Sequence, residues 1–106
     1  MNVTIRGESD EVIDRMTYAF TKYTHQHPEA QIEIRRQNSV TIYIRVIDPD
    51  FTAINRGERH EILWQFLEPL SDDDQSQVSL LLALTPAETK NSFANLEFDH
   101  PVPSGL

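Results

Sequence analysis

Two stretches in the middle of the chain alternate apolar and polar residues with a period of two. They cover residues 30–36 and 40–47, and in both of them isoleucine or valine returns at every second position. This alternation is typical of strands that bury one face and leave the other in water. The segment 37–39 between them is short, and its asparagine tolerates the left-handed conformation that a tight turn needs. The pattern therefore predicts a β-hairpin over residues 30–47.

Two other stretches repeat their apolar residues at helical spacing. The first follows Ser9, a good N-cap, and ends before Pro28, because the residue before a proline avoids the helical region. The second begins near Arg56, where Asn55 and Glu58 have the spacing of a capping box. The predicted helices bury two apolar stripes. These stripes are Val12, Ile13, Met16, Ala19, Phe20 and Tyr23 in the first helix, and Ile62, Leu63, Phe66, Leu67 and Leu70 in the second.

Shorter elements flank these two helices. Val3 and Ile5 alternate with polar residues and predict a leading strand that ends at Gly7. Ser71 is followed by three aspartates, which favour the positive end of a helix, so a short third helix is expected over residues 72–77.

The segment 78–84 is almost wholly apolar and predicts a strand that is covered on both faces. We expect one face to carry Val78, Leu80, Leu82 and Leu84, and the other to carry Leu81 and Ala83. The motif 85–88 (Thr-Pro-Ala-Glu) has the cap, the proline and the glutamate that begin a short final helix. Residues 91–106 then form an extended tail. Either this tail or a second copy of the chain is expected to cover the excess apolar surface of the strand.

The order of elements predicts a two-layer α+β domain. It reads αββααβ with an extra N-terminal strand and a short C-terminal helix, and its helices lie on one face of a small mixed sheet. A strand–helix–strand crossover is right-handed, so the last strand should run parallel to the second strand of the hairpin. We assign residues 1–90 to this single domain and residues 91–106 to a tail that packs on or near the sheet.

Composition narrows the class of protein. The chain has 106 residues, no cysteine, and a formal charge of −8 from 17 acidic and 9 basic residues. Thiolate chemistry is therefore excluded, and the net charge argues against non-specific nucleic-acid binding. The start has no apolar core or basic leader, and no run of about 18 apolar residues occurs. We therefore expect no signal peptide and no membrane span, and we place the protein in the cytoplasm of a bacterium-like cell.

Basic residues gather in one part of this acidic chain. Five arginines fall between positions 35 and 59, and they are Arg35, Arg36, Arg45, Arg56 and Arg59. One interpretation is a local binding patch; the other is that the arginine stems lie along the edge of the sheet with their charged ends in water.

The order of motifs in residues 10–90 resembles the BolA family. The resemblance consists of Phe51 after the hairpin, the pair Arg59-His60 at the start of the next helix, and Thr85-Pro86 with Glu88 after an apolar strand. It implies the αββααβ fold that this family shares with class II KH domains. Members of the family bind monothiol glutaredoxins, and some share a [2Fe–2S] cluster with them through the histidine of the Arg-His pair. Others are DNA-binding regulators.

The resemblance implies a ligand role for His60 alone, and the residue type leaves two interpretations open. His60 is one turn before Trp64, so its imidazole can stack on the indole as a boundary residue of the core. In the other interpretation it is a metal ligand or an anchor in a partner interface. The other candidate metal ligands lie in predicted loops and are weaker candidates than His60. These are His25 and His27 with Glu29, which we expect to be solvated, and Asp48 and Asp50, which have the character of turn residues but could converge with His60 at one end of the sheet.

We therefore expect a non-enzymatic protein-binding or adaptor module without a cofactor. Its docking surface would be the start of the second helix and the adjacent end of the sheet, formed by Arg56, Arg59, His60 and Trp64. The alternatives are a metal-handling or iron–sulfur partner of a monothiol glutaredoxin that uses His60, and a nucleic-acid-binding regulator. A homodimer is also compatible with the sequence.

Overall fold

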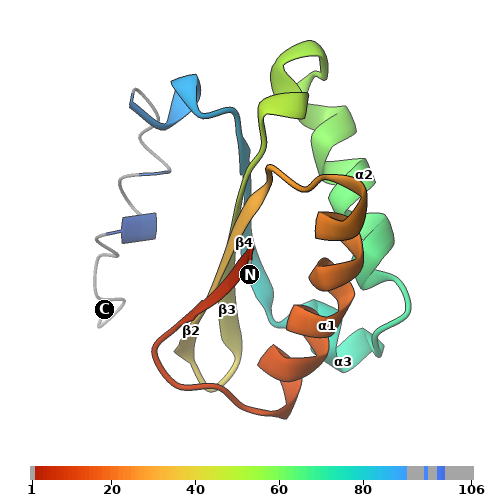
Figure 1. The fold of residues 1–106 in the computed structure, drawn as a ribbon. Coiled ribbons are helices and arrows are strands. Elements are labelled where there is room, and N and C mark those ends of the chain that lie inside the picture. The colour runs from red at the N-terminus through yellow and green to blue at the C-terminus, as the bar shows by residue number, and fades with distance from the viewer. Residues whose placement is uncertain (1, 91–94, 96–97, 100–106) are drawn as a thin grey trace.

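Four strands form one mixed sheet in the order β1-β2-β3-β4 (Figure 1). The computed structural model describes residues 2–90, 95, 98 and 99. The hairpin strands β2 (Gln31–Asn38) and β3 (Thr41–Ile47) are antiparallel. The outer strands β1 (Val3–Arg6) and β4 (Val78–Leu84) each run parallel to their neighbour. The predicted direction of the last strand is therefore confirmed.

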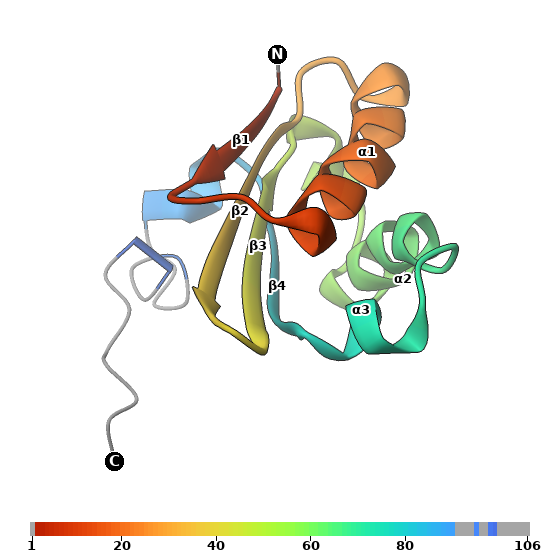
Figure 2. The same cartoon turned by 90° about the horizontal axis from the view of Figure 1, so that it is seen from below.

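The helices lie together on one face of this sheet (Figure 2). They are α1 (Glu11–Gln26), α2 (Arg56–Leu67) and the short α3 (Asp72–Ser76). Two 3-10 turns complete the order, η1 (Pro49–Ala53) after β3 and η2 (Ala87–Lys90) after β4. The predicted two-layer α+β arrangement is confirmed, and its core lies between α1, α2 and the inner face of the sheet.

The helix caps follow the sequence closely, with one shift. The side chain of Asn55 accepts a hydrogen bond from Glu58 N at 2.9 Å, and that of Ser71 accepts one from Asp74 N at 3.1 Å, as predicted. The N-cap of α1 is Asp10 rather than Ser9, since its carboxylate accepts from Ile13 N at 2.9 Å. An ionised cap interacts more strongly with the positive end of a helix than a hydroxyl does.

Two details of the strands differ from the prediction. The hairpin turn is Ser39-Val40, so Val40 is 67% exposed and does not belong to β3. In β4 the register shifts at Ser79, because Ile42 pairs with Val78 whereas Tyr43 pairs with Leu80. This bulge moves Val78 to the helix-covered face, where Leu81 and Ala83 also pack. The expected grouping of Val78 with Leu80, Leu82 and Leu84 is therefore wrong.

The opposite face of the sheet is covered in part by the C-terminal region. Asn95, Phe98 and Asp99, the described residues of the predicted tail, have helical rather than extended backbone. Phe98 is fully buried, and the Arg45 guanidinium carbon lies 4.5 Å from the centre of its ring. Arg35 donates a hydrogen bond to Phe98 O at 2.6 Å. On this face of the sheet, a buried aromatic ring surrounded by arginines therefore takes the place of an open polar surface.

Candidate functional site

The structure corrects one member of the predicted docking surface. Arg56 and His60 are exposed and Trp64 is half-buried, so these three are accessible at the outer side of α2. Arg59 is only 5% exposed and points into the molecule. Position 59 belongs to the same helical face as Leu63, which is four residues later and fully buried. Arg59 therefore has a structural role and is unavailable to a partner.

The Arg59 guanidinium joins three segments of the chain. It donates to Ile54 O at 2.8 Å, to Phe51 O at 2.8 Å and to Ala83 O at 3.2 Å. It also forms an ion pair with Glu88 at 2.7 Å. Arg59 thus ties η1, the edge strand β4 and η2 to the start of α2.

Glu88 makes the stability of this junction depend on pH. Its hydrogen bond from Arg59, followed by the bond from Thr85 N, lowers the Glu88 pKa from 4.5 to about 2. Because the pKa is lower in the folded state, Glu88 contributes stability above pH 4.5, and this contribution is lost as the pH falls from 4.5 through 2. We expect Glu88→Gln to lower stability at pH 7 and to flatten its decline over this window. Urea unfolding at several pH values measures the effect, and a variant whose acid decline parallels the native one would contradict it.

The other arginines do not form an open basic patch. Arg36 pairs with the N-cap carboxylate of Asp10 at 2.5 Å, and Arg45 pairs with Glu33 and with Asp99. Arg35 lies against Phe98. Carboxylates of the same chain neutralise Arg36 and Arg45, and a carbonyl and a ring hold Arg35, so these arginines are less available to phosphate.

His60 and Trp64 line a shallow hollow on the outer side of α2. The hollow has a volume of about 390 Å³, and its walls are His60, Glu61, Trp64, Gln65 and Glu68. Trp64 also packs on the edge of the core. The rings of these two described residues form no stacked pair, so the stacking that one of the two interpretations of His60 allowed is not seen.

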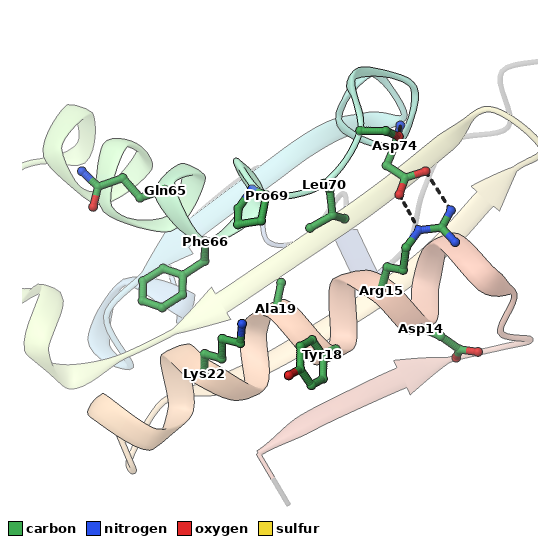
Figure 3. A pocket seen from close by; sticks show the side chains of 11 residues that line it. Asp14, Arg15, Tyr18, Ala19, Lys22, Gln65, Phe66, Pro69, Leu70 and Asp74 are labelled. Carbon is green, nitrogen blue, oxygen red and sulfur yellow. Dashed lines mark hydrogen bonds and ion pairs between the residues drawn. The ribbon is translucent and has the colours of Figure 1, made fainter.

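A larger groove lies between α1 and α2, and the pattern of apolar residues does not predict it. Its volume is about 700 Å³, and most of its exposed lining surface is apolar. Figure 3 shows the side chains around it. Ala19, Phe66, Pro69 and Leu70 form its apolar part, and Tyr18, 68% exposed, stands at its rim. A groove of this kind depends on how far apart two helices lie, which the pattern of a single helix does not reveal.

One end of the groove is closed by an ion pair between α1 and α3. Arg15 donates to both carboxylate oxygens of Asp74, at 2.6 and 3.0 Å, and Figure 3 shows the two bonds. The contact with Arg15 lowers the pKa of Asp74. The three aspartates of α3 therefore have the predicted capping position, and one of them also fixes the end of the groove.

A second polar cluster lies where α1 ends and β3 passes into η1. His27 Nδ1 is 2.8 Å from Asp50 Oδ2 and 3.4 Å from Asp48 Oδ2. Tyr23 donates its hydroxyl proton to the buried Asp48 at 2.5 Å, and its ring stacks on His27 with centroids 4.3 Å apart. Burial and the neighbouring Asp48 raise the pKa of Tyr23.

The cluster alters two expectations about its residues. Asp48 and Asp50 do converge with a histidine, but with His27 and not with His60. His27 is therefore partly buried in a cluster instead of solvated, whereas His25 is exposed as expected. The sequence could not select between the histidines, because the selection depends on where the end of α1 meets the end of β3.

Comparisons with family models, with curated proteins and with solved structures find no match to this chain. Within the described part of the chain, no helix is long and apolar enough to cross a membrane.

Proposed function

We propose that this protein is a non-enzymatic binding module that holds a basic amphipathic segment of a partner protein in the groove between α1 and α2. The observation that carries the proposal is the mainly apolar groove of about 700 Å³ on the helical face of an otherwise charged chain. Grooves between packed helices accept the apolar face of a partner helix in several kinds of complex. The expected class of function is kept, and its centre moves from the start of α2 to the groove.

The shape and composition of the groove support a peptide-like occupant. Ala19, the only small side chain among its lining residues on α1, leaves room beside Phe66 and Leu70. Tyr18 offers an exposed aromatic ring at the rim, with the Lys22 ammonium 4.8 Å from the ring centre. An apolar centre with an aromatic and charged rim is the usual composition of a protein interface.

The charge of the chain indicates which kind of partner segment fits the groove. The chain carries a formal charge of −8, and of the two cations that line the groove Arg15 is neutralised by Asp74, while Lys22 lies over the Tyr18 ring. The exposed carboxylates on the surrounding helices or at their ends are Glu11, Asp14, Glu58, Glu61, Glu68, Asp72 and Asp73. A segment with lysine or arginine beside its apolar face therefore fits this surface better than an acidic one.

The hollow at His60 and Trp64 extends the same surface. Gln65 lines both the groove and the hollow, so the two depressions share a wall on α2. A segment longer than the groove would therefore cross Gln65 and reach His60. Of the three accessible residues of the predicted docking surface, His60 and Trp64 thus lie at the outer end of the proposed surface, whereas Arg56 does not line it.

Peptides of matched design test the proposal. We expect a helical peptide with leucines on one face and lysines beside them to bind, and the same peptide with glutamates in place of lysines to bind at least tenfold more weakly. Fluorescence anisotropy gives the affinities, and amide shifts in a two-dimensional NMR spectrum locate the peptide. The largest shifts are expected around Ala19, Phe66 and Leu70.

A pair of variants at one exposed position provides the control. Gln65→Lys should weaken the lysine peptide and Gln65→Glu should strengthen it, because the two changes alter only the charge of the rim. Val40→Ala, which removes an exposed apolar side chain outside the groove, should change nothing. Equal binding of the two peptides, shifts confined to other surfaces, or self-association through the groove in sedimentation experiments would refute the proposal.

A further inference from the structure

The cluster of His27, Asp48 and Asp50 has the features of a cation site. We infer that it binds one divalent transition-metal ion of the Zn²⁺ class through His27 Nδ1 and one oxygen from each carboxylate. The inference is independent of the binding groove, since no residue of this cluster lines that groove.

The three ligand atoms lie close enough together to surround one metal ion. With metal–ligand distances near 2.1 Å, two ligands at the tetrahedral angle are about 3.4 Å apart. The distance from His27 Nδ1 to Asp48 Oδ2 is 3.4 Å, and that from His27 Nδ1 to Asp50 Oδ2 is 2.8 Å. All three ligand atoms lie within 4.8 Å of one another. The Asp50 side chain is 61% exposed, so it has room to change its distance from His27 when an ion binds.

The charge balance of the cluster supplies a second, independent argument. The other described charged residues that are buried each have a charged partner: Arg45 has Glu33, Arg59 has Glu88, and Asp74 has Arg15. Asp48 is buried as deeply as any of them, with its side chain 1% exposed, yet within the described residues it has no lysine or arginine partner. A buried carboxylate requires a compensating positive charge, and a second carboxylate beside it increases that requirement.

The support for Asp48 in the fold is neutral rather than cationic. Its two oxygens accept hydrogen bonds from the Tyr23 hydroxyl and from Asp50 N, at 2.5 and 2.9 Å. Such bonds hold the carboxylate in a fixed orientation without balancing its charge, as bonds from neighbouring groups do for metal-bound carboxylates. His27 is held in turn by its stacking on Tyr23.

The position of the cluster also favours a cation. His27 is the C-cap of α1, so the site lies at the negative end of a 16-residue helix. The exposed Asp50 leaves one side of the cluster open to solvent, which gives an ion a route of entry. One imidazole nitrogen and two carboxylate oxygens are ligands that suit Zn²⁺, Mn²⁺ or Fe²⁺, and a fourth position would hold water.

Titration of the intact chain with Zn²⁺ alone, followed by isothermal calorimetry, tests the inference. We expect one ion per chain and a rise of several degrees in the unfolding midpoint when Zn²⁺ is present, since the ion binds the folded state. His27→Ala and Asp50→Asn should each weaken binding at least tenfold. Asp50→Asn keeps the shape of an exposed side chain, so it reports on the ligand even if His27→Ala loses stability through Tyr23.

His25→Ala is the matched control, because His25 is exposed, lies two residues before His27 and is outside the cluster. It should leave the affinity and the stoichiometry unchanged. Absence of stoichiometric binding to the native chain, or affinity that His25→Ala lowers as much as His27→Ala does, would overturn the inference. Unaltered affinity in a folded Asp50→Asn variant would do so as well.

Discussion

Replacement of Arg59 by alanine is expected to lower the free energy of unfolding by about 3–5 kcal/mol, the usual cost of removing one partner from a buried ion pair. The guanidinium is 5% exposed and donates to three backbone carbonyls as well as to Glu88. Without it, the carbonyls of Phe51 and Ala83 lose a buried donor, and such groups are costly to leave without a partner. Equilibrium unfolding in urea at pH 7 measures the loss.

Arg56→Ala is the matched control for this prediction. Arg56 is three residues earlier on α2 and exposed, so its removal should change stability by less than about 0.5 kcal/mol. A domain of this size has a total stability of roughly 5–15 kcal/mol, so the Arg59 variant should be marginally folded near room temperature. Similar values for the two variants would show that the carbonyls find water or another donor, and the structural role of Arg59 would have to be abandoned.

Arg59 also shows where sequence reasoning on a single helix reaches its limit. Periodicity located the helix, its Asn55 cap and its buried leucines, because each of these depends on residues within a few positions. The direction of the Arg59 side chain depends instead on carbonyls at residues 51, 54 and 83. An arginine in an acidic chain was expected at the surface, but its five donors are what the junction of three segments requires.

The candidate sites were less predictable than the fold, because they too depend on contacts between segments that are far apart in the sequence. Asp48 and Asp50 were recognised as residues that could meet a histidine at one end of the sheet. The histidine that meets them, His27, comes from the end of a helix that precedes the hairpin, and only the packing of α1 on the sheet brings it there. The groove is likewise a property of two helices together, although the proline that ends α2 and the exposed Tyr18 are local signs of it.

The sequence predicted only part of what covers the face of the sheet opposite the helices. The sequence predicted that the apolar last strand requires cover from residues 91–106 or from a second copy. Phe98 does lie against that side of the sheet, but its described contacts are with arginines. Burial of Arg35 and the nearby charge of Arg6 lower the pKa of Arg35, which reflects how closely these cations are held. The Phe98 ring among them attracts the three guanidiniums through cation–π contacts.

Phe98→Ala is accordingly expected to lower the free energy of unfolding by about 3–5 kcal/mol, as for other buried phenylalanines, although the residue belongs to the predicted tail. Tyr18→Ala, which removes an aromatic side chain that is 68% exposed, should cost far less. Urea unfolding compares the two variants under the same conditions.

Deletion of residues 91–106 should also cause the chain to self-associate, which Phe98→Ala should do to a smaller extent. It uncovers Arg45 and leaves the half-buried Leu80 and Leu82 of β4 on a face without Phe98, and exposed apolar edges of this kind favour association. Sedimentation velocity should therefore show dimers or larger species that grow with concentration. A truncated chain that stays monomeric and as stable as the native one would contradict this prediction. Phe98 would then contribute nothing to stability, and only Glu33 and water would separate the arginines.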